Sequence, residues 1–381
     1  MKLKIFTMNI MVDGEAMDNP ASELAQIILN CGADIVILSE SNSAALLKKI
    51  INKVGGQWAG ARAGSSAVLS SKPLGLLDKQ LKAVNKITTG DVIDNGSDSP
   101  AYNGASGITV LVDIANSGTF DKKSLIVSSV HPEYRNYAAY LPRGYDGNTW
   151  KPLLDGAVTD IKKIQDANRK SGREAQLNQV LTAIEKYEAI YNAKKMTSVI
   201  AGDFNEPSGV DWSEGLKSCF GHHGVVYDWD TTRLLREKEY IDTFHHARLK
   251  KNGLTENSPR KDIDTCIIKH PGITWQSCPP KNKQGHWGDQ ADDRDRLDFI
   301  FIRPTDTTTA DIQDSVIVGD NYYYGYYQGQ TSGTSVCKLN DSSNGTIDDF
   351  LTLGYPKSDE QHFPSDHRGV LTTVDLSALI E

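Results

Sequence analysis

Short apolar runs that end in a polar side chain recur along this chain, and they predict the strands of a sheet. Residues 2–10 alternate polar and apolar positions and end beside Asn9. Residues 33–40 form a continuous β-branched and aliphatic run, typical of a strand covered on both faces, and Glu40 ends it. The pattern therefore places polar side chains at the ends of buried strands.

Helical spacing separates these strands. Asn19 is a suitable N-cap, the apolar residues of 24–31 form one stripe, and Gly32 suits the position after the helix. The same spacing predicts helices over residues 43–54, 155–170 and 173–191. Strands that alternate with helices, with polar residues at the strand ends, indicate an α/β layer fold with a site along one edge.

The remaining apolar runs predict further strands. They cover residues 65–74, 107–114, 124–130, 296–303 and 370–374, with shorter candidates at 263–269 and 273–276. Of the polar residues on these segments, His131 follows one strand directly and Asp298 lies near the start of another. Each of these residues alone has an ordinary structural explanation, since polar side chains are common at strand ends.

The stretch 198–207 concentrates the chemistry. After a short apolar run, Gly202 permits a sharp bend and Pro207 blocks a regular continuation. Asp203 and Asn205 then lie two residues apart, one an anionic acceptor and the other an amide that donates and accepts. The pair suits phosphate chemistry, although a plain turn with local hydrogen bonds uses the same residues.

Composition sets the outer limits. The chain has 381 residues, of which 39% are hydrophobic, so it can bury a large core. We expect one domain over residues 1–381, with insertions near 133–157 and 304–363 that follow no assignable pattern. The net charge of −8 disfavours a broad grip on duplex nucleic acid without excluding a local basic groove. No apolar run approaches the roughly 20 residues of a membrane helix.

Five cysteines show neither a CxxC pair nor zinc spacing. Cys31 closes an amphipathic helix and belongs to the core. The other four could form two disulfides, which favours an oxidising compartment: Cys219, Cys266, Cys278 and Cys337. The sequence as given begins with strand-like residues and shows no signal peptide. Because of the possible disulfides, we nevertheless expect a secreted or periplasmic protein whose leader has been removed, rather than a cytoplasmic one.

Six short pieces, in chain order, resemble the endonuclease/exonuclease/phosphatase superfamily. They are residues 8–9 (MN), 35–40 (IVILSE), 129–131 (SVH), 202–205 (GDFN), 296–299 (RLDF) and 365–367 (SDH). The resemblance implies a DNase I-like four-layer sandwich, α/β, with two mixed β-sheets packed face to face and helices outside. It also implies hydrolysis of phosphate esters with a divalent metal, Mg²⁺ by preference, with Mn²⁺ or Ca²⁺ as alternatives.

The resemblance implies a role for each residue. Glu40 is a hard oxygen ligand of the metal, and Asn9 and Asp366 flank the ion directly or through water. Asp203 orients or deprotonates the attacking water, Asn205 donates to a phosphate oxygen, and His131 and His367 stabilise the transition state. Asp298 holds His367 in one tautomer.

Three points stay open after this comparison. The base is either Asp203 or the pair of Asp298 and His367. Arg143, in the irregular loop beside His131, is a candidate substrate-binding residue. The chain also departs from the nuclease pattern, because no glutamate between residues 40 and 133 can pair with His131, and Ser39 stands where a glutamine is usual.

The substrate is the widest uncertainty of the sequence. We expect a phosphodiesterase or nuclease that acts on DNA or RNA. We also expect it to be a monomer. The alternative is an enzyme directed at phospholipid or inositol phosphate, of the sphingomyelinase kind, in which the tyrosine-rich residues 322–327 meet a membrane surface. An inactive binding scaffold is the third alternative.

Overall fold

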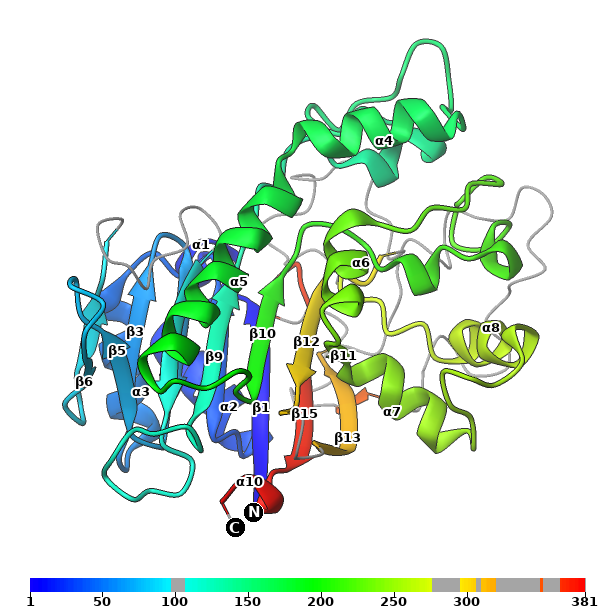
Figure 1. Cartoon of the computed structure of the whole chain (residues 1–381). Coiled ribbons are helices and arrows are strands. Elements are labelled where there is room, and N and C mark those ends of the chain that lie inside the picture. The colour runs from blue at the N-terminus through cyan, green and yellow to red at the C-terminus, as the bar shows by residue number, and fades with distance from the viewer. Residues whose placement is uncertain (97–106, 276–294, 306–309, 320–349, 352–363, 381) are drawn as a thin grey trace.

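The computed structural model describes residues 1–96, 107–275, 295–305, 310–319, 350–351 and 364–380. Within them, two mixed β-sheets pack face to face and helices cover their outer faces (Figure 1). The four-layer α/β sandwich predicted from the sequence is confirmed. The predicted tyrosine-rich surface at residues 322–327 lies outside the described residues.

The first sheet has the strand order β14-β13-β15-β1-β2-β4-β3-β7 in the described part of the chain. Its strands are β1 (Lys2–Asn9), β2 (Ile35–Ser39), β3 (Ala59–Ala63), β4 (Ser66–Ser70), β7 (Val92–Asp94), β13 (Asp311–Val318), β14 (Phe350–Leu351) and β15 (Gly369–Asp375). The second sheet has the order β11-β12-β10-β9-β8-β5-β6. Its strands are β5 (Leu74–Leu77), β6 (Val84–Lys86), β8 (Gly107–Val112), β9 (Leu125–Val130), β10 (Ser198–Asp203), β11 (Ile241–Asp242) and β12 (Asp298–Arg303).

Helices complete the outer layers. The α-helices are α1 (Met11–Gly14), α2 (Pro20–Cys31), α3 (Ala44–Val54), α4 (Ile161–Lys170), α5 (Arg173–Ile190), α6 (Asp230–Glu237), α7 (Thr243–Lys251), α8 (Arg260–Lys269) and α10 (Ser377–Ile380). The short 3-10 helices of the described residues are η2 (Ala138–Arg143), η3 (Gly209–Asp211) and η4 (Glu214–Leu216). α2 and α3 pack on the outer face of the first sheet, and α5 lies against β8 and β9 of the second. No helix among the described residues combines the length and the apolar character that crossing a bilayer requires.

Strand alternation explains why polar residues meet at one end of the sandwich. In β1, Leu3 and Ile5 face the core between the sheets, whereas Phe6 and Met8 pack against the helical layer. Asn9 continues the inward series because successive strand side chains alternate between faces. β1 and β2 run parallel with Asn9 opposite Ser39, so both strands end at the same edge.

Hydrogen bonds across the sandwich fix the spacing of the two sheets at that edge. The Ser39 hydroxyl donates to the carbonyl of Val130 over 3.2 Å and accepts from the backbone N–H of Asp203 over 3.1 Å. Ser39 is buried on β2, whereas Val130 and Asp203 end β9 and β10. The serine found where a glutamine is usual therefore ties the two sheets together beside the site.

Gly202 does not make the predicted bend. It lies inside β10 at a φ of +141°, and a Cβ built on it would come within 2.0 Å of the carbonyl oxygen of Val130. The position therefore requires glycine because β9 approaches too closely for any side chain. Strand β10 continues through Gly202 to Asp203.

One predicted strand is wrong, one predicted helix begins later than expected, and one predicted insertion contains a strand of the sheet. Residues 263–269 were predicted as a strand but lie in α8, whose Ile263, Cys266 and Ile267 have helical spacing and face the core. The helix predicted over 155–170 begins only at Ile161, because the Asp160 carboxylate accepts from the N–H of Lys163 and caps it. The region 304–363, predicted as an insertion, includes β13, which pairs with β15 in the first sheet.

The cysteine prediction is also corrected. Cys266 keeps a reduced thiol, buried in the core under α8, and its Sγ donates to the carbonyl of Arg248. Cys219 is disulfide-bonded and Cys31 is a buried thiol, as predicted. Since Cys266 is not bonded to another cysteine, the two disulfides predicted from four cysteines cannot both form.

Candidate active site

A cleft of about 430 Å³ opens at the end of the sandwich where β1, β2, β9 and β10 finish. Its lining contains most of the predicted site residues together with a group of aromatic side chains. The lining residues are Met11, Val12, Glu15, Glu40, Asn42, Ser65, His131, Tyr134, Tyr137, Trp150, Asp203, Asn205, Trp275, Leu297, Asp366 and His367. The tertiary structure thus brings together residues from both sheets and from the loops that follow them.

Glu40 is held by its neighbours in a conformation that its own backbone disfavours. Its φ is +58°, in the left-handed region. The N–H of Val12 donates to Glu40 Oε2 over 2.8 Å, and the N–H of Asp13 donates to the Glu40 carbonyl over 2.9 Å. Met11, Val12 and Asp13 all have positive φ as well, so a strained turn fixes the carboxylate toward the cleft.

Asn9 connects the two acidic residues at the centre. Its Nδ2 lies 3.0 Å from Glu40 Oε1 and 3.0 Å from Asp203 Oδ2, donating to both. The Ser365 hydroxyl donates to the Asn9 carbonyl over 2.7 Å, so the last loop of the chain is attached at the same point. The amide therefore sets the position of Glu40 relative to Asp203.

Asp203 lies between two imidazoles. Its Oδ2 is 3.7 Å from His131 Nε2 and 3.7 Å from His367 Nε2. Its Oδ1 accepts from the N–H of Asn205 over 2.8 Å, and the residue is buried. This arrangement leaves Oδ2 directed at the space where a reacting group would stand.

Asp298 and His367 form the predicted pair. Asp298 Oδ2 lies 2.8 Å from His367 Nδ1, and both residues are buried. Burial alone lowers the pKa of His367, but the carboxylates of Asp298 and Asp203 outweigh it and raise the pKa to about 10. Burial raises the pKa of Asp298 to about 6 against the attraction of His367. The bond to Nδ1 leaves Nε2 facing Asp203.

Residues that the sequence did not reveal support this pair. The Thr274 hydroxyl accepts from the backbone N–H groups of Leu297 and Asp298 over 2.9 and 3.0 Å. The Ser365 hydroxyl accepts from the N–H of His367 over 3.1 Å. Thr274 belongs to no recognisable sequence motif, and its spacing from Asp298 matches none. Only the folded structure shows that Thr274 supports Asp298.

His131 has a different partner from the glutamate of the nuclease pattern. Its Nδ1 lies 2.7 Å from the hydroxyl of Ser65, which precedes β4. Its Nε2 lies 3.9 Å from Glu40 Oε1 in addition to the approach to Asp203. Ser65 thus holds the ring with its Nε2 toward the cleft, and no sequence pattern distinguishes this serine from its neighbours.

Two predicted substrate-binding residues differ in their placement. Asn205 lines the cleft at a φ of +50°, and its Nδ2 donates to the carbonyl of Pro132 over 3.1 Å. The amide carries a second N–H for a ligand. Arg143 does not line the cleft, because its buried guanidinium is ion-paired to the buried Asp295, with Nη2 2.9 Å from Oδ1.

The donor set fits a hard divalent cation. Glu15, Glu40, Asp203 and Asp366 bring four carboxylates to the cleft, and among the described residues that line it no lysine or arginine offsets them. Burial raises the pKa of Asp366, and the charges of Glu40 and Asp203 raise it further, against His367. No other described residue donates a hydrogen bond to that carboxylate, so Glu40 and Asp366, with Asn9, are the residues that could hold Mg²⁺.

A tighter group is a poorer candidate for the metal. Ligand atoms of Asp203, Asp298 and His367 all lie within 4.8 Å of one another. However, His367 Nδ1 and Asp298 Oδ2 are already engaged with each other at 2.8 Å, which leaves no room for an ion between them. We therefore assign these three residues to proton and charge handling rather than to metal ligation.

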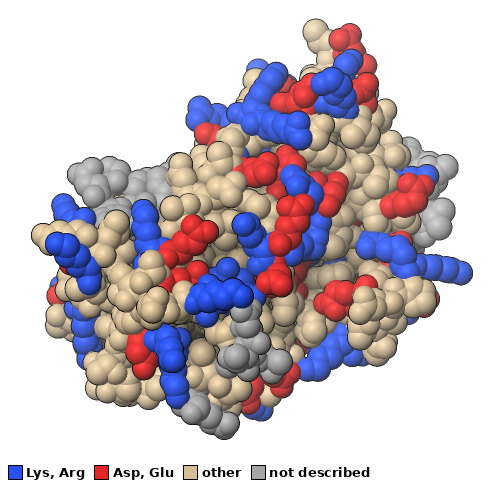
Figure 2. Space-filling view, viewed as in Figure 1, with Lys and Arg blue, Asp and Glu red and all other residues tan. Residues whose placement is uncertain are grey.

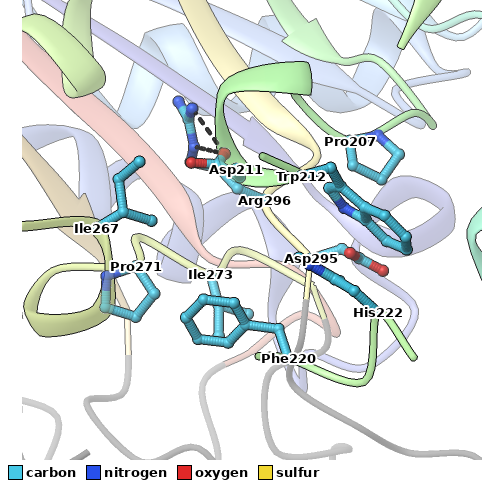
Figure 3. A pocket seen from close by; sticks show the side chains of 10 residues that line it. All are labelled: Pro207, Asp211, Trp212, Phe220, His222, Ile267, Pro271, Ile273, Asp295 and Arg296. Carbon is cyan, nitrogen blue, oxygen red and sulfur yellow. Dashed lines mark hydrogen bonds and ion pairs between the residues drawn. The ribbon is translucent and has the colours of Figure 1, made fainter. Parts of the chain in front are cut away.

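A second cavity, of about 10 Å³, is lined by residues that include Asp211, Asp295 and Arg296 and is too small for a ligand (Figure 3). Asp211 faces Arg296 across its wall, with Arg296 Nη2 2.9 Å from Asp211 Oδ2. Arg248 also contacts Asp211, and the two guanidinium groups hold the pKa of Asp211 below its usual range although burial opposes them. This ion cluster fixes the segment that leads into Asp298.

Comparison with known protein families gives a match over nearly the whole chain. A family model described as the Endonuclease/Exonuclease/phosphatase family matches residues 7–367. An uncharacterised protein of Caenorhabditis elegans is 23% identical over 305 residues, which cover 79% of this chain and 78% of that protein.

Similar solved structures are more distant. An endonuclease/exonuclease/phosphatase from Beutenbergia cavernae is 15% identical with a TM-score of 0.44, covering 98% of this chain and 72% of that one. The D. rerio TDP2 complexed with single strand DNA product is 14% identical with a TM-score of 0.42, covering 98% and 99%. Likeness at this level adds nothing to the family match.

Proposed function

The chain belongs to the endonuclease/exonuclease/phosphatase family, and on that premise we propose that it is a metal-dependent phosphodiesterase. Members of the family are phosphoester hydrolases. The observation that carries the proposal is the position of Asp203, whose Oδ2 lies 3.7 Å from the Nε2 atoms of both His131 and His367. One carboxylate between two imidazoles, beside an acidic cation site, suits water attack on a phosphate.

The acidic side of the cleft holds the metal in this proposal. Glu40 and Asp366 are the direct ligands, and Asn9 sets the position of Glu40 through its 3.0 Å hydrogen bond. When bound, a divalent ion such as Mg²⁺ supplies positive charge that polarises the phosphoryl group and offsets the charge of the carboxylates. The strained turn at residues 11–13 holds Glu40 in place before any ligand arrives.

Asp203 is the proposed acceptor of the proton from the attacking water. Its Oδ1 is fixed by the N–H of Asn205 and its Oδ2 is steadied by Asn9, so the carboxylate is oriented without losing access to the cleft. The alternative base, the pair of Asp298 and His367, is less suited. Burial lowers the pKa of His367, but the carboxylates of Asp298 and Asp203 outweigh it and raise that pKa to about 10. The ring then carries a proton on both nitrogens, so Nε2, 3.7 Å from Asp203 Oδ2, can donate but not accept.

The two histidines and Asn205 face the phosphate. Nε2 of His131 and Nε2 of His367 stand on either side of Asp203, where each can donate to a phosphoryl oxygen as negative charge develops. Ser65 and Asp298 hold the opposite ring nitrogens and so fix both orientations. Asn205 contributes its second amide N–H from the rim of the same cleft.

The disulfide at Cys219 supports a secreted or periplasmic location, because disulfides persist in oxidising compartments. On the face shown in Figure 2, acidic and basic side chains are interspersed rather than gathered into a basic patch. This distribution agrees with the net charge of −8 and with a substrate that is gripped in the cleft rather than over a wide surface.

The test is hydrolysis of bis(4-nitrophenyl) phosphate with and without Mg²⁺. We expect turnover that EDTA abolishes and that Mg²⁺ restores. Asp203→Asn should lower kcat by about 10²- to 10⁴-fold, the usual contribution of a positioned acid or base. Asp166→Asn, the same change at an exposed residue of α4, is the control and should leave kcat unchanged. Turnover that is indifferent to EDTA, or an active Asp203→Asn, would overturn the proposal.

A further inference from the structure

One side of the cleft is aromatic. We call this side the aromatic wall, formed by Tyr134, Tyr137, Trp150 and Trp275. Tyr134 is 50% exposed although it is a large aromatic residue, and its ring centroid lies 6.2 Å from that of Trp150. Trp275 lies at the inner end of the wall, 6.3 Å from the ring of His367. The wall therefore extends from the rim of the cleft to the proposed catalytic residues.

The two loops that carry the wall are fastened to each other. The N–H of Tyr137 donates to the Gly147 carbonyl over 3.0 Å, and the N–H of Asn136 donates to Asn148 Oδ1 over 2.9 Å. A Cβ built on Gly147 would come within 2.6 Å of the Tyr137 backbone, so only glycine allows this approach. Tyr134 and Trp150 thus belong to one joined unit.

Arg173, at the start of α5, anchors the loop that carries Tyr134. Its Nη1 donates to the carbonyls of Glu133 and Arg135 over 2.8 and 3.1 Å, and its Nη2 donates to that of Asn136 over 3.1 Å. Arg173 is buried, and its Nε lies 3.7 Å from the buried carboxylate of Glu206, next to Asn205. One side chain therefore holds the loop of Tyr134 in register with the loop of Asp203.

The backbone of Trp150 is held in an unfavourable conformation. Its φ is +56°, a region that bulky aromatic residues seldom adopt. Such conformations cost about 1–3 kcal/mol each and cluster at ligand-binding sites, where the surrounding structure enforces them. The Trp150 N–H donates to the Asp146 carbonyl over 2.9 Å, which helps to hold the ring on the wall.

The polar side chains of the cleft limit the kind of ligand that could bind beside the aromatic wall. Among the described residues that line the cleft, none is a lysine or an arginine, and the histidines are His131 and His367. Arg135, next to Tyr134, is already bound to Glu133 through two contacts of 2.7 Å. The described cleft therefore offers two imidazole rings for one phosphate group and aromatic faces for the group attached to it. A rigid, flat surface suits a flat ligand, because stacking then costs little conformational freedom.

We propose that the aromatic wall is a subsite for a planar aromatic ring carried by the phosphate ester whose phosphorus lies at Asp203, with Tyr134 and Trp150 as the stacking residues. The inference rests on the proposed function for the position of the phosphate. It narrows the substrate class to aryl or nucleoside phosphate esters, which share the planar ring, as opposed to esters of aliphatic chains. Arg173 is the positioning residue of this subsite.

The test is calorimetric binding, with Mg²⁺ present, of two matched pairs of phosphates. Phenyl and cyclohexyl phosphate differ in flatness at equal ring size and charge, and uridine 5′-monophosphate and ribose 5-phosphate differ by the base. We expect the planar member of at least one pair to bind about three- to tenfold tighter, the range expected for one aromatic contact. The first pair identifies aryl esters as ligands, and the second identifies nucleotides.

The variants Tyr134→Ala and Trp150→Ala should each reduce this preference, and the double variant should abolish it. Tyr134→Phe keeps the ring and should preserve it. Equal affinities within both pairs in the unsubstituted protein, or a preference that survives the double variant, would overturn the inference. So would decyl phosphate binding that depends on the wall while the planar preference is absent, because the wall would then serve an aliphatic chain.

Binding and turnover separate the two proposals. Planar preference without hydrolysis of any phosphodiester would overturn the proposed function and leave the subsite intact. Metal-dependent hydrolysis with a kcat/KM for phenyl esters that is indifferent to both alanine variants would overturn the subsite alone.

Discussion

The Nδ1 atom of His131 lies 2.7 Å from the hydroxyl of Ser65, a residue 66 positions earlier in the chain. The contact supplies the partner that the sequence lacks, since no glutamate precedes His131 in the expected region. A hydroxyl can donate to or accept from an imidazole, so it fixes ring orientation without bringing a second negative charge to an already acidic cleft.

Removing that hydroxyl should slow the reaction. In Ser65→Ala, the His131 ring loses its only described hydrogen bond at Nδ1. We expect kcat to fall by about tenfold, the equivalent of one lost hydrogen bond. Ser65→Thr keeps a hydroxyl and should retain most of the activity. If the alanine variant matches the wild-type kcat, Ser65 is not a positioning residue for His131.

Glu40→Gln should weaken the binding of Mg²⁺. Asn9 Nδ2 and the Val12 N–H each donate to one oxygen of the carboxylate. The amide has the same shape but no charge and a single oxygen, and its NH2 would face one of these two donors. We expect Mg²⁺ affinity to fall by at least about tenfold in titration calorimetry, since even indirect supports of a metal site contribute that much. Glu185→Gln, on the exposed face of α5, is the matched control. Unchanged affinity in Glu40→Gln would place the ion elsewhere.

Asp298 and His367 should act as a unit. Their 2.8 Å contact is buried, and neither group has an equivalent partner if the other is lost. In a double-mutant cycle of Asp298→Ala and His367→Ala, either single change should cost nearly as much kcat/KM as both together. Thermal midpoints of all three variants serve as the control for folding. Losses that add would mean that the residues work independently.

Arg173→Met should destabilise the protein strongly. The substitution leaves the carboxylate of Glu206 buried beside Asn168 and Thr231 without its positive partner, and it releases three backbone carbonyls. Breaking such a buried pair costs about 3–5 kcal/mol, which urea unfolding would resolve. Arg169→Met, at an exposed position near the end of α4, should cost little. A similar small effect for both would show that Arg173 is dispensable for stability.

His222 should make the fold sensitive to mild acid. Its ring stacks on Trp212 with centroids 3.8 Å apart, and its Nδ1 lies 3.0 Å from the carbonyl of Leu216. Burial, together with the charge of Arg143, lowers the pKa of His222 to about 3. The folded state therefore disfavours the proton that the unfolded chain takes up near pH 6.5, and the stabilisation present above that pH is lost as the pH falls toward 3.

The measurement is the free energy of unfolding in urea from pH 7.5 down to 4.5, for the wild type and His222→Phe. His222 lies beside Trp212 (Figure 3). A phenylalanine at position 222 can keep this ring stack but does not titrate. We expect the wild-type curve to fall more steeply by up to about 1.4 kcal/mol per pH unit, the slope for one proton. Groups other than His222 contribute equally to both curves and cancel. Parallel curves would mean that His222 titrates as it would in the unfolded chain.

The sequence determined the layers of this protein and the identity of its central residues. The apolar alternation of β1 and the continuous apolar run of β2 are local properties. They therefore predicted both strands and the positions of Asn9 and Glu40 at their ends. Asp203 and Asp298 were found for the same reason, since each stands beside a run of core residues. A local pattern of this kind survives in the sequence because burial acts on every residue of a strand.

Tertiary structure alone decided which partners those residues have. Ser65, Thr274 and Arg173 lie far along the chain from His131, Asp298 and Tyr134, and nothing in their own surroundings marks them. The helix at α8 was missed for a related reason, because a short apolar run fits a strand or a helix until packing selects one. Arg143 was assigned to substrate by proximity in sequence, whereas the fold buried it against Asp295. Contacts between distant segments depend on how two sheets stack, and no single segment contains that information.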